Sequence, residues 1–170
     1  MESKAKLFGH AIHPMLIVFP LGLLATSLIL DIVHLAGGGG RWAQAAFYDM
    51  GIGIIGGLLA AIFGLIDWLA IPNGTRAKSI GARHGLGNLI VVVLFVVNWA
   101  LRKGHPQDPG AVPIVLSFIG IGLALITAWL GGELVDRLRV GVDDGAHLNA
   151  PSSLSGHPAG DRTTAAPMGD

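Results

Sequence analysis

The chain has 170 residues, of which 52% are hydrophobic and only 13% are charged, and its mean hydropathy is +0.64. Soluble domains carry roughly a quarter charged residues, so this composition indicates a membrane protein whose first partner is the lipid bilayer. The formal net charge is zero and gives no electrostatic basis for binding nucleic acid. The chain has no cysteine, which excludes disulfides, thiolate metal sites and cysteine-ligated iron–sulfur clusters.

Four long apolar segments divide the chain. Each is close to the roughly 20 residues that cross about 30 Å of hydrocarbon as a helix. A backbone inside a bilayer must satisfy its own hydrogen bonds, so helices are predicted rather than open strands. The connections are short and contain Gly and Pro, which makes consecutive helices antiparallel neighbours. We predict an all-α integral membrane protein, an up-down-up-down four-helix bundle within residues 1–142, with spans at about 14–35, 45–71, 84–101 and 112–135.

Residues inside the spans predict some features of the packing. Pro20 lies within the first span and has no N–H to donate, so a kink is expected near it. Small residues recur every four positions from Gly120 to Gly132 in the fourth span. This spacing lets helix backbones approach closely in lipid. The stripe is expected to serve packing within the bundle, and a homo-oligomer interface is the alternative.

Residues 143–170 differ in composition from the rest of the chain. They are rich in Gly, Pro, Ala, Ser and Thr and contain almost no large apolar side chain. Such a segment cannot bury enough apolar surface to offset the entropy lost on ordering. It is predicted to be a disordered tail.

The positions of Lys and Arg predict the orientation in the membrane, because cytoplasmic segments carry an excess of both. One side of the bundle carries Lys4, Lys6, Arg76, Lys78, Arg83, Arg137 and Arg139, and the other carries Arg41, Arg102 and Lys103. The remaining one, Arg162, lies in the tail. Both termini and the tail are therefore predicted to be cytoplasmic.

Every predicted helix brings side chains that could act as ligands to this cytoplasmic end. Imidazole and charged groups in spans are costly and usually face the bundle interior. The candidates are His10 and His13 from the first helix, Asp67 from the second, His84 and Asn88 from the third and Glu133 from the fourth. We expect them to meet in one polar chamber.

Two kinds of cofactor would suit that chamber. A divalent ion such as zinc, iron or manganese could be bound by His10, His13, Asp67, His84 and Glu133. The Glu-x-x-His spacing of di-iron bundles is missing, however. Alternatively, His13 and His84 lie on helices that are diagonal in an up-down bundle and could be the axial ligands of haem b, with Asn88 in the same site. Either cofactor indicates a small redox or sensing role.

The same polar groups could also serve without a cofactor. They could relay protons for a transport accessory. They could equally form a purely structural cluster in which Asp67 pairs with Arg76 or Arg83. Asp31 and His34, three residues apart, are expected to pair at the opposite end of the first helix. No Ser, His and acid arrangement suggests a nucleophile, so no catalytic residue is predicted.

Four motifs, HPMLIVFPLGLL, GLIDW, ARHGLGN and GGELVDRLRVGV, together resemble the bacterial membrane proteins grouped as domain of unknown function 2231 (DUF2231), over about residues 8–142. The resemblance implies a bacterial inner-membrane protein and marks His13, Pro14, Pro20, Asp67, His84, Asn88, Gly131, Gly132 and Glu133. The family usually has an aromatic residue where this chain has Asp136. Some relatives are joined to Rieske-type iron–sulfur domains, so the resemblance implies electron transfer, for which this cysteine-free chain would need a redox partner.

Overall fold

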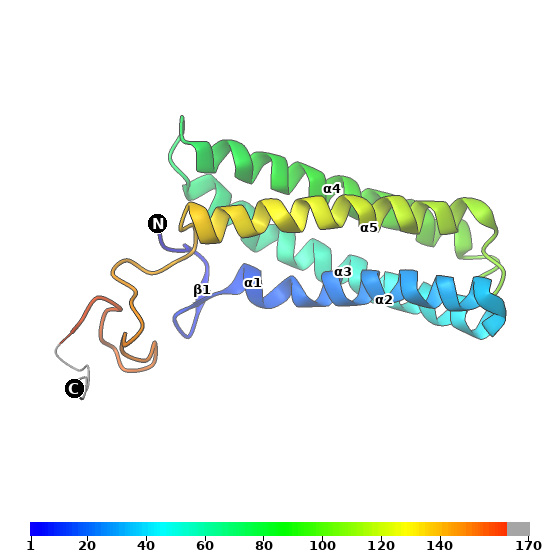
Figure 1. Cartoon of the computed structure of the whole chain (residues 1–170), viewed down its shortest axis with the longest axis horizontal. Helices are drawn as coiled ribbons and strands as arrows, with labels where there is room; N and C mark the ends of the chain where they lie inside the picture. Colours follow the sequence, from blue (N-terminus) through cyan, green and yellow to red (C-terminus); the bar gives the residue numbers. More distant parts are fainter. Residues whose placement is uncertain (163–170) are drawn as a thin grey trace.

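The computed structural model describes residues 1–162 and contains four long helices that run side by side and antiparallel in chain order (Figure 1). Four stretches, Ile12–Gly38, Gly40–Ala70, Arg76–Arg102 and Ala111–Arg137, are long and apolar enough to cross a membrane, which confirms the predicted fold class. The elements are β1 (Lys6–Leu7), β2 (His10–Ala11), α1 (Ile12–Leu16), α2 (Val18–Val33), η1 (His34–Gly38), α3 (Gly40–Ala70), α4 (Arg76–Arg102), α5 (Ala111–Gly132) and η2 (Glu133–Arg137), where η marks a π-helical turn.

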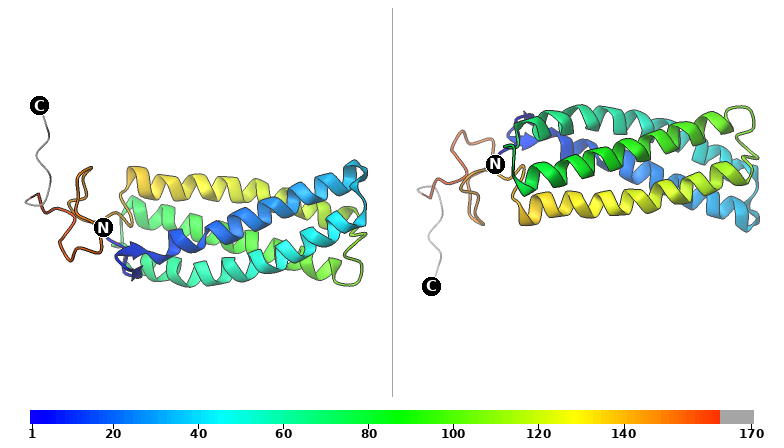
Figure 2. Two further views of the ribbon diagram at one scale, coloured as in Figure 1. Left: turned by 90° about the horizontal axis from the view of Figure 1, so that it is seen from below. Right: turned by 90° about the horizontal axis from the view of Figure 1, so that it is seen from above.

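The helices are arranged as two hairpins that pack against each other. Helix α2 lies along α3, and α4 lies along α5, while α3 borders α4 and α2 borders α5 (Figure 2). The α1–α2 segment and α4 are therefore diagonal across the bundle. Both ends of the described chain lie at one end of the bundle, here called the terminal end (Figure 1). The opposite end, here called the loop end, contains the connections around residues 34–40 and 103–110.

Helix α4 begins at Arg76, well before the predicted start at residue 84. The Oγ1 atom of Thr75 accepts a hydrogen bond from the backbone N–H of Lys78 at 3.1 Å. A threonine in this position caps the first turn of a helix and satisfies one of its free N–H groups. His84 consequently lies more than two turns inside α4 rather than at its first residue.

The first span is interrupted at Ile17, between α1 and α2. Pro20 follows three residues later and has no N–H to donate to the carbonyl of Leu16, and the kink expected near it stays a prediction. Pro14 causes no such break, because it occupies the first turn of α1, where N–H groups have no partner within the helix. The short helix α1 packs against α3 and places His13 beside it.

The apolar core lies in the middle of the bundle, where Leu24, Ala46, Met50, Ile54, Val91 and Phe95 are buried. Gly120 allows α5 to approach α4 closely at this level. A Cβ atom built on Gly120 would lie 2.6 Å from the Phe95 ring, which is too close for any side chain. At this position the small residue of the fourth span therefore serves packing inside the bundle.

The segment after the bundle folds against the N-terminal segment. Residues 143–162 form turns without helix or strand, and residues 163–170 of the predicted disordered tail lie outside the described residues. The Lys6 ammonium lies 2.5 Å from an Asp143 oxygen and 2.8 Å from a Glu2 oxygen. Strands β1 and β2 form a hairpin whose two turn residues, Phe8 and Gly9, both have positive φ, at 50° and 84°.

Candidate functional site

Two histidines from diagonal helices approach each other inside the terminal end of the bundle. His13 lies in α1 and His84 in α4, and both side chains are partly buried. Their ring centres are 6.3 Å apart, and the ring planes are nearly perpendicular at 84°. Of the six predicted ligands, these two form the pair that the structure brings together from opposite corners of the bundle.

Each of these imidazoles is fixed by a backbone carbonyl of a neighbouring helix. The Nδ1 atom of His13 lies 2.8 Å from the carbonyl oxygen of Ala60 in α3. The Nδ1 atom of His84 lies 2.8 Å from the carbonyl oxygen of Thr127 in α5. A carbonyl can only accept, so Nδ1 must carry the proton in both rings. In the neutral imidazoles, both Nε2 atoms therefore present a lone pair.

Asn88 and Thr127 extend the site from His84. The side-chain nitrogen of Asn88 lies 3.1 Å from Nε2 of His84, one turn earlier in α4. The Thr127 hydroxyl lies 2.8 Å from the Asn88 oxygen and 2.9 Å from the Ala124 carbonyl oxygen. The back-bond to Ala124 follows from the usual behaviour of a hydroxyl within a span. The contact to Asn88 has no local sequence signal, because the two residues are 39 positions apart.

Glycines make room for both imidazole rings. A Cβ atom on Gly64 in α3 would lie 2.9 Å from two atoms of the His13 ring. A Cβ atom on Gly131 in α5 would lie 3.1 Å from Cε1 of His84. Each ring therefore lies against bare backbone of the adjacent helix. The small residues near the terminal end accommodate the two histidines as well as the packing of the helices.

The predicted carboxylate ligands are engaged elsewhere, which corrects the single polar chamber. Asp67 accepts hydrogen bonds from the Ser3 hydroxyl at 2.8 Å and from the backbone N–H of Lys4 at 2.7 Å. It therefore holds the N-terminal segment and pairs with neither Arg76 nor Arg83. Glu133 forms its ion pair with Arg76, at 2.5 Å. Both interactions occupy carboxylate oxygens that a metal ion would need.

His10 is also separated from the pair. It belongs to the exposed β1–β2 hairpin, and its Nε2 lies 3.2 Å from the Ser153 hydroxyl. Within residues 1–162, no group of three or more His, Cys, Asp or Glu side chains is placed to hold a metal ion. The five-ligand site predicted for a divalent ion is thus not assembled in the part of the chain that the structure describes.

A second polar cluster, missed from the sequence, is buried at the loop end. The Arg102 guanidinium in α4 donates to both oxygens of Asp31 in α2, at 2.6 and 2.7 Å. Asn98 accepts from Nε of Arg102 at 2.7 Å and donates to the Ser117 hydroxyl at 2.8 Å. These four residues, here called the loop-end network, have no solvent-exposed surface. Asp31 therefore pairs with Arg102 and not with His34, whose Nδ1 lies 3.2 Å from the Gly39 carbonyl oxygen.

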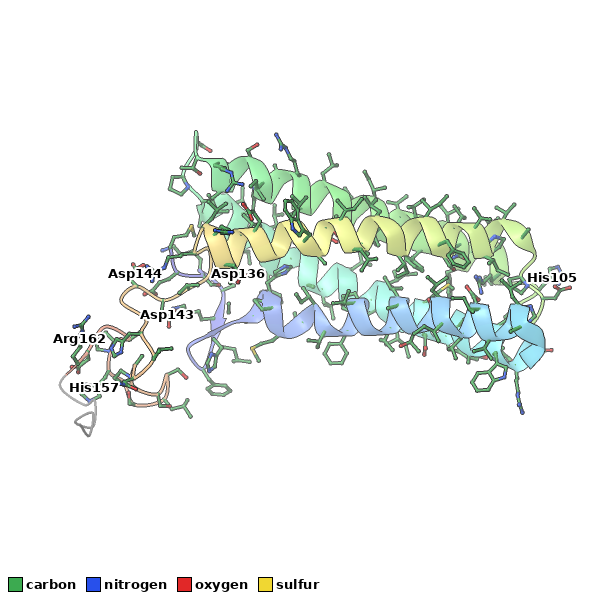
Figure 3. The ribbon with its side chains drawn as sticks, in the orientation of Figure 1. His105, Asp136, Asp143, Asp144, His157 and Arg162 are labelled. Atoms are coloured by element: carbon green, nitrogen blue, oxygen red, sulfur yellow. The ribbon has the colours of Figure 1, made fainter. Side chains whose placement is uncertain are left out.

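Asp136 and His105 lie outside these clusters. Figure 3 shows Asp136 at the terminal end of α5 and His105 in the connection at the loop end. Asp136 is exposed at the edge of the bundle, where an aromatic residue was expected. Its polarity suits the boundary of the span, because it is in η2 beside the exposed Arg137.

Comparison with known proteins supports one assignment. The family model described as a predicted membrane protein, DUF2231, matches residues 9–144. The chain belongs to the DUF2231 family. The DUF2231 match includes His13, His84 and the whole loop-end network, and it ends where the tail begins. No curated protein and no solved structure matches the chain.

Proposed function

We propose that His13 and His84 are the two axial ligands of one haem b, held inside the terminal end of the bundle, and that the protein has a small redox or sensing role. The distance between the rings is the main support. With metal–nitrogen bonds of about 2 Å, two imidazoles that would hold one haem between them would have ring centres roughly 6 Å apart. The His13 and His84 ring centres are 6.3 Å apart.

The hydrogen bonds of the two rings also favour ligation. Histidines that bind metals usually donate their other N–H to a carbonyl or carboxylate, which fixes the tautomer and directs the free lone pair at the metal. Both rings donate Nδ1–H to a helix carbonyl, Ala60 for one and Thr127 for the other. The Nε2 lone pair of His13 therefore remains available as a ligand, and that of His84 becomes available once the Asn88 amide moves away.

The number of available donors favours haem over a bare ion. Zinc takes four ligands in structural sites and three protein ligands plus water in catalytic sites. Within residues 1–162 no third His or carboxylate joins the two imidazoles. Haem supplies four equatorial nitrogens of its own and needs only axial ligands from the protein. Two isolated histidines therefore suit haem better than they suit a divalent ion.

In this proposal Asn88 is not a ligand of the iron but a hydrogen-bond partner of His84. Its amide occupies the lone pair of His84 Nε2 in the structure, at 3.1 Å. Iron binding at this nitrogen requires the amide to withdraw. Thr127 holds the oxygen of the same side chain at 2.8 Å and can keep it beside the site. Asn88 thus positions and protects His84 and competes with the iron for its lone pair.

A visible absorption spectrum tests the proposal directly. The full chain, purified in detergent and mixed with haem b, should give the sharp Soret and α bands of six-coordinate, low-spin iron. His13→Ala and His84→Ala should each lose that spectrum. His34→Ala and His105→Ala are matched controls, because these histidines lie at the loop end, and both should retain it. A chain that leaves the haem spectrum unchanged would contradict the proposal, as would stoichiometric zinc or iron in a colourless preparation.

A structural role is the second candidate, and one observation favours it. The two Nδ1–H groups already link α1 to α3 and α4 to α5. If this were the only role, His13→Ala would lower the free energy of unfolding by about 0.5–1.5 kcal/mol. In that case no cofactor would bind, and the chain would act as a structural subunit of the membrane.

We also propose that the terminal end faces the cytoplasm of a bacterial inner membrane. The loop end has few cations to oppose the Lys and Arg residues of the terminal end. Arg102 is fully buried in its ion pair, which leaves Arg41 and Lys103 exposed there. Because the chain has no cysteine, single-cysteine variants report orientation without background. A membrane-impermeant maleimide should label His105→Cys in intact cells and should leave Ser155→Cys unlabelled until the cells are opened.

A further inference from the structure

Helix α3 carries polar side chains without partners on the face that it turns to lipid. Tyr48 is 59% exposed and Asp49 is partly exposed. Neither has a hydrogen-bond or ion-pair partner among the residues that the structure describes. Neither residue bonds to the loop-end network or to the histidine pair.

The depth of Asp49 makes its lack of a partner costly. Helix α3 has 31 residues, which at 1.5 Å per residue is about 46 Å, against roughly 30 Å of hydrocarbon. Asp49 is nine residues from the first residue, Gly40, which is about 13 Å along the helix. With the helix centred in the bilayer, Asp49 lies about 5 Å inside the hydrocarbon. Carboxylates at this depth normally face a partner or a wet cavity.

The exposed residues around Asp49 form a regular seam. Tyr48, Ile52, Ile55, Leu59, Ile62 and Ile66 are all exposed, and their spacing alternates between four and three residues. This spacing is that of the a and d positions of a coiled coil. The core residues Ala46, Met50 and Ile54 lie on the opposite side of α3 and leave the seam free.

In this heptad frame Tyr48 is a d position, Asp49 an e position and Gln44 the preceding g position. Residues at g and e, five positions apart, meet across a parallel two-stranded pair. Gln44 already accepts from Gln107 through its oxygen, at 3.0 Å, which leaves its amide N–H groups free to donate. The donor Gln44 and the acceptor Asp49 therefore stand at complementary positions on one helix face.

We propose that this seam is the interface with a second copy of the chain, in which α3 packs parallel to α3 of the partner. A two-fold axis along the membrane normal keeps both copies at the same depth and repeats every contact twice. The Asp49 carboxyl group of each copy then accepts from Gln44, or from the Tyr48 hydroxyl, of the other copy. Polar side chains that bond between helices are a recognised source of association in lipid. This proposal does not depend on haem binding.

Disulfide crosslinking in membranes tests the interface, because the natural chain has no cysteine. Ile55→Cys places a thiol on the seam, and Ile126→Cys places one on α5 with the same exposure, 61% against 60%. Two differently tagged copies are expressed together, and their membranes are treated with a mild oxidant at low protein density. We expect at least tenfold more crosslinked pair of the two tags from Ile55→Cys than from Ile126→Cys.

A second set of variants tests the role of Asp49 itself. In the Ile55→Cys background, Asp49→Leu should reduce crosslinking to the level of the control. Asp49→Asn should retain most of it, because the amide oxygen still accepts a hydrogen bond. The proposal is overturned if Ile55→Cys crosslinks no better than Ile126→Cys, or if Asp49→Leu leaves the yield unchanged. In detergent dilute enough to separate the copies, unfolding of Asp49→Leu should match that of the parent, because Asp49 bonds to nothing within the described part of its own chain.

Discussion

Two polar clusters lie at opposite ends of the same bundle and differ in how completely their atoms are bonded. In the loop-end network, Arg102, Asp31, Asn98 and Ser117 have no exposed surface and bond to one another. The histidine pair at the terminal end is partly exposed, and among the described residues the Nε2 atom of His13 has no hydrogen-bond partner, while that of His84 is bonded to Asn88 alone. A buried network with every group bonded serves stability and specificity of the fold. An imidazole lone pair without a partner, in a partly accessible site, can instead bind a ligand.

The largest expected effect comes from removing one charge of the loop-end network. Arg102→Ala leaves the Asp31 carboxylate buried without its partner, which should lower the free energy of unfolding by about 3–5 kcal/mol. Denaturant titration of the purified chain in detergent measures this change. The neighbouring Lys103 is exposed and provides the control. Lys103→Ala should change the free energy by no more than about 0.5 kcal/mol.

Removing both charges of the ion pair should be less destabilising than removing one. In Asp31→Leu combined with Arg102→Met, no unpaired charge remains in the core. Replacing a buried ion pair by apolar residues of similar volume is often neutral. The double variant should therefore recover at least half of the stability lost in Arg102→Ala. A double variant that is less stable than Arg102→Ala would mean that the network contributes through hydrogen bonds to Asn98 and Ser117 more than through charge.

Two asparagines on the same helix separate the clusters more finely. Asn98 is fully buried and accepts from Arg102, whereas Asn88 is partly buried beside His84. Asn98→Leu leaves a buried N–H of the guanidinium unpaired and should cost about 1–3 kcal/mol. Asn88→Leu removes ordinary hydrogen bonds and should cost about 0.5–1.5 kcal/mol. Equal losses in the same denaturant titration would contradict the distinction between a closed and an open cluster.

The predictable part of this molecule is the part controlled by hydropathy. Four apolar segments with short connections permit few arrangements, so the spans and their antiparallel order follow from composition and length. The start of α4 is harder to predict, because Arg76, Lys78 and Arg83 make its first two turns look like a connection. The cap at Thr75 is the available signal for the earlier start.

The site can be predicted only in part from the sequence, because the partner that each side chain contacts depends on the packing of distant segments. His13 and His84 face each other because diagonal helices in a four-helix bundle share one interior. Asp67 and Glu133 are on the same end, but their partners, Ser3 and Arg76, belong to segments without any periodic signal. Arg102 looks like a surface cation because Lys103 and a Pro-containing connection follow it. Long-range pairs of this kind are decided by packing, which a single sequence does not specify.

Asn88 should also affect the affinity of the chain for haem b. If its amide competes with iron for Nε2 of His84, Asn88→Leu should increase the affinity for haem b about fivefold, since a hydrogen bond of about 1 kcal/mol no longer has to be broken. Titration of the apoprotein with haem, followed in the Soret band, measures the affinity. Thr127→Val should have a smaller effect in the same direction, because it only loosens the Asn88 side chain. A decrease in affinity would instead mean that Asn88 helps to bind the haem.

The smallest expected effect concerns the contact between the tail and the N-terminal segment outside the membrane. The hydrogen bond to Asp143, followed by that to Glu2, raises the pKa of Lys6 above its usual 10.5. The hydrogen bond from Lys6 likewise holds the pKa of Glu2 below its usual 4.5. The Glu2 contribution is therefore present above about pH 4.5 and is lost as the pH falls through the lowered value. The Lys6 contribution is present below about pH 10.5 and is lost as the pH rises through the raised value.

Hydrogen exchange at the Asp144 amide follows this contact, because its N–H donates to Glu2 at 3.1 Å. At pH 7, Lys6→Met should accelerate exchange there, since the ion pairs that hold Glu2 and Asp143 together are gone. The exposed Lys4 is the matched control, because its side chain forms no hydrogen bond to Glu2 and its charge acts on Glu2 only weakly, so Lys4→Met should change the rate much less than Lys6→Met. As the pH falls through the lowered pKa of Glu2, the difference between the parent and Lys6→Met should shrink, because Glu2 becomes protonated. A difference that stays constant down to about pH 2 would assign the contact to the backbone bonds of Met1 with Arg139 and Gly141 rather than to charge.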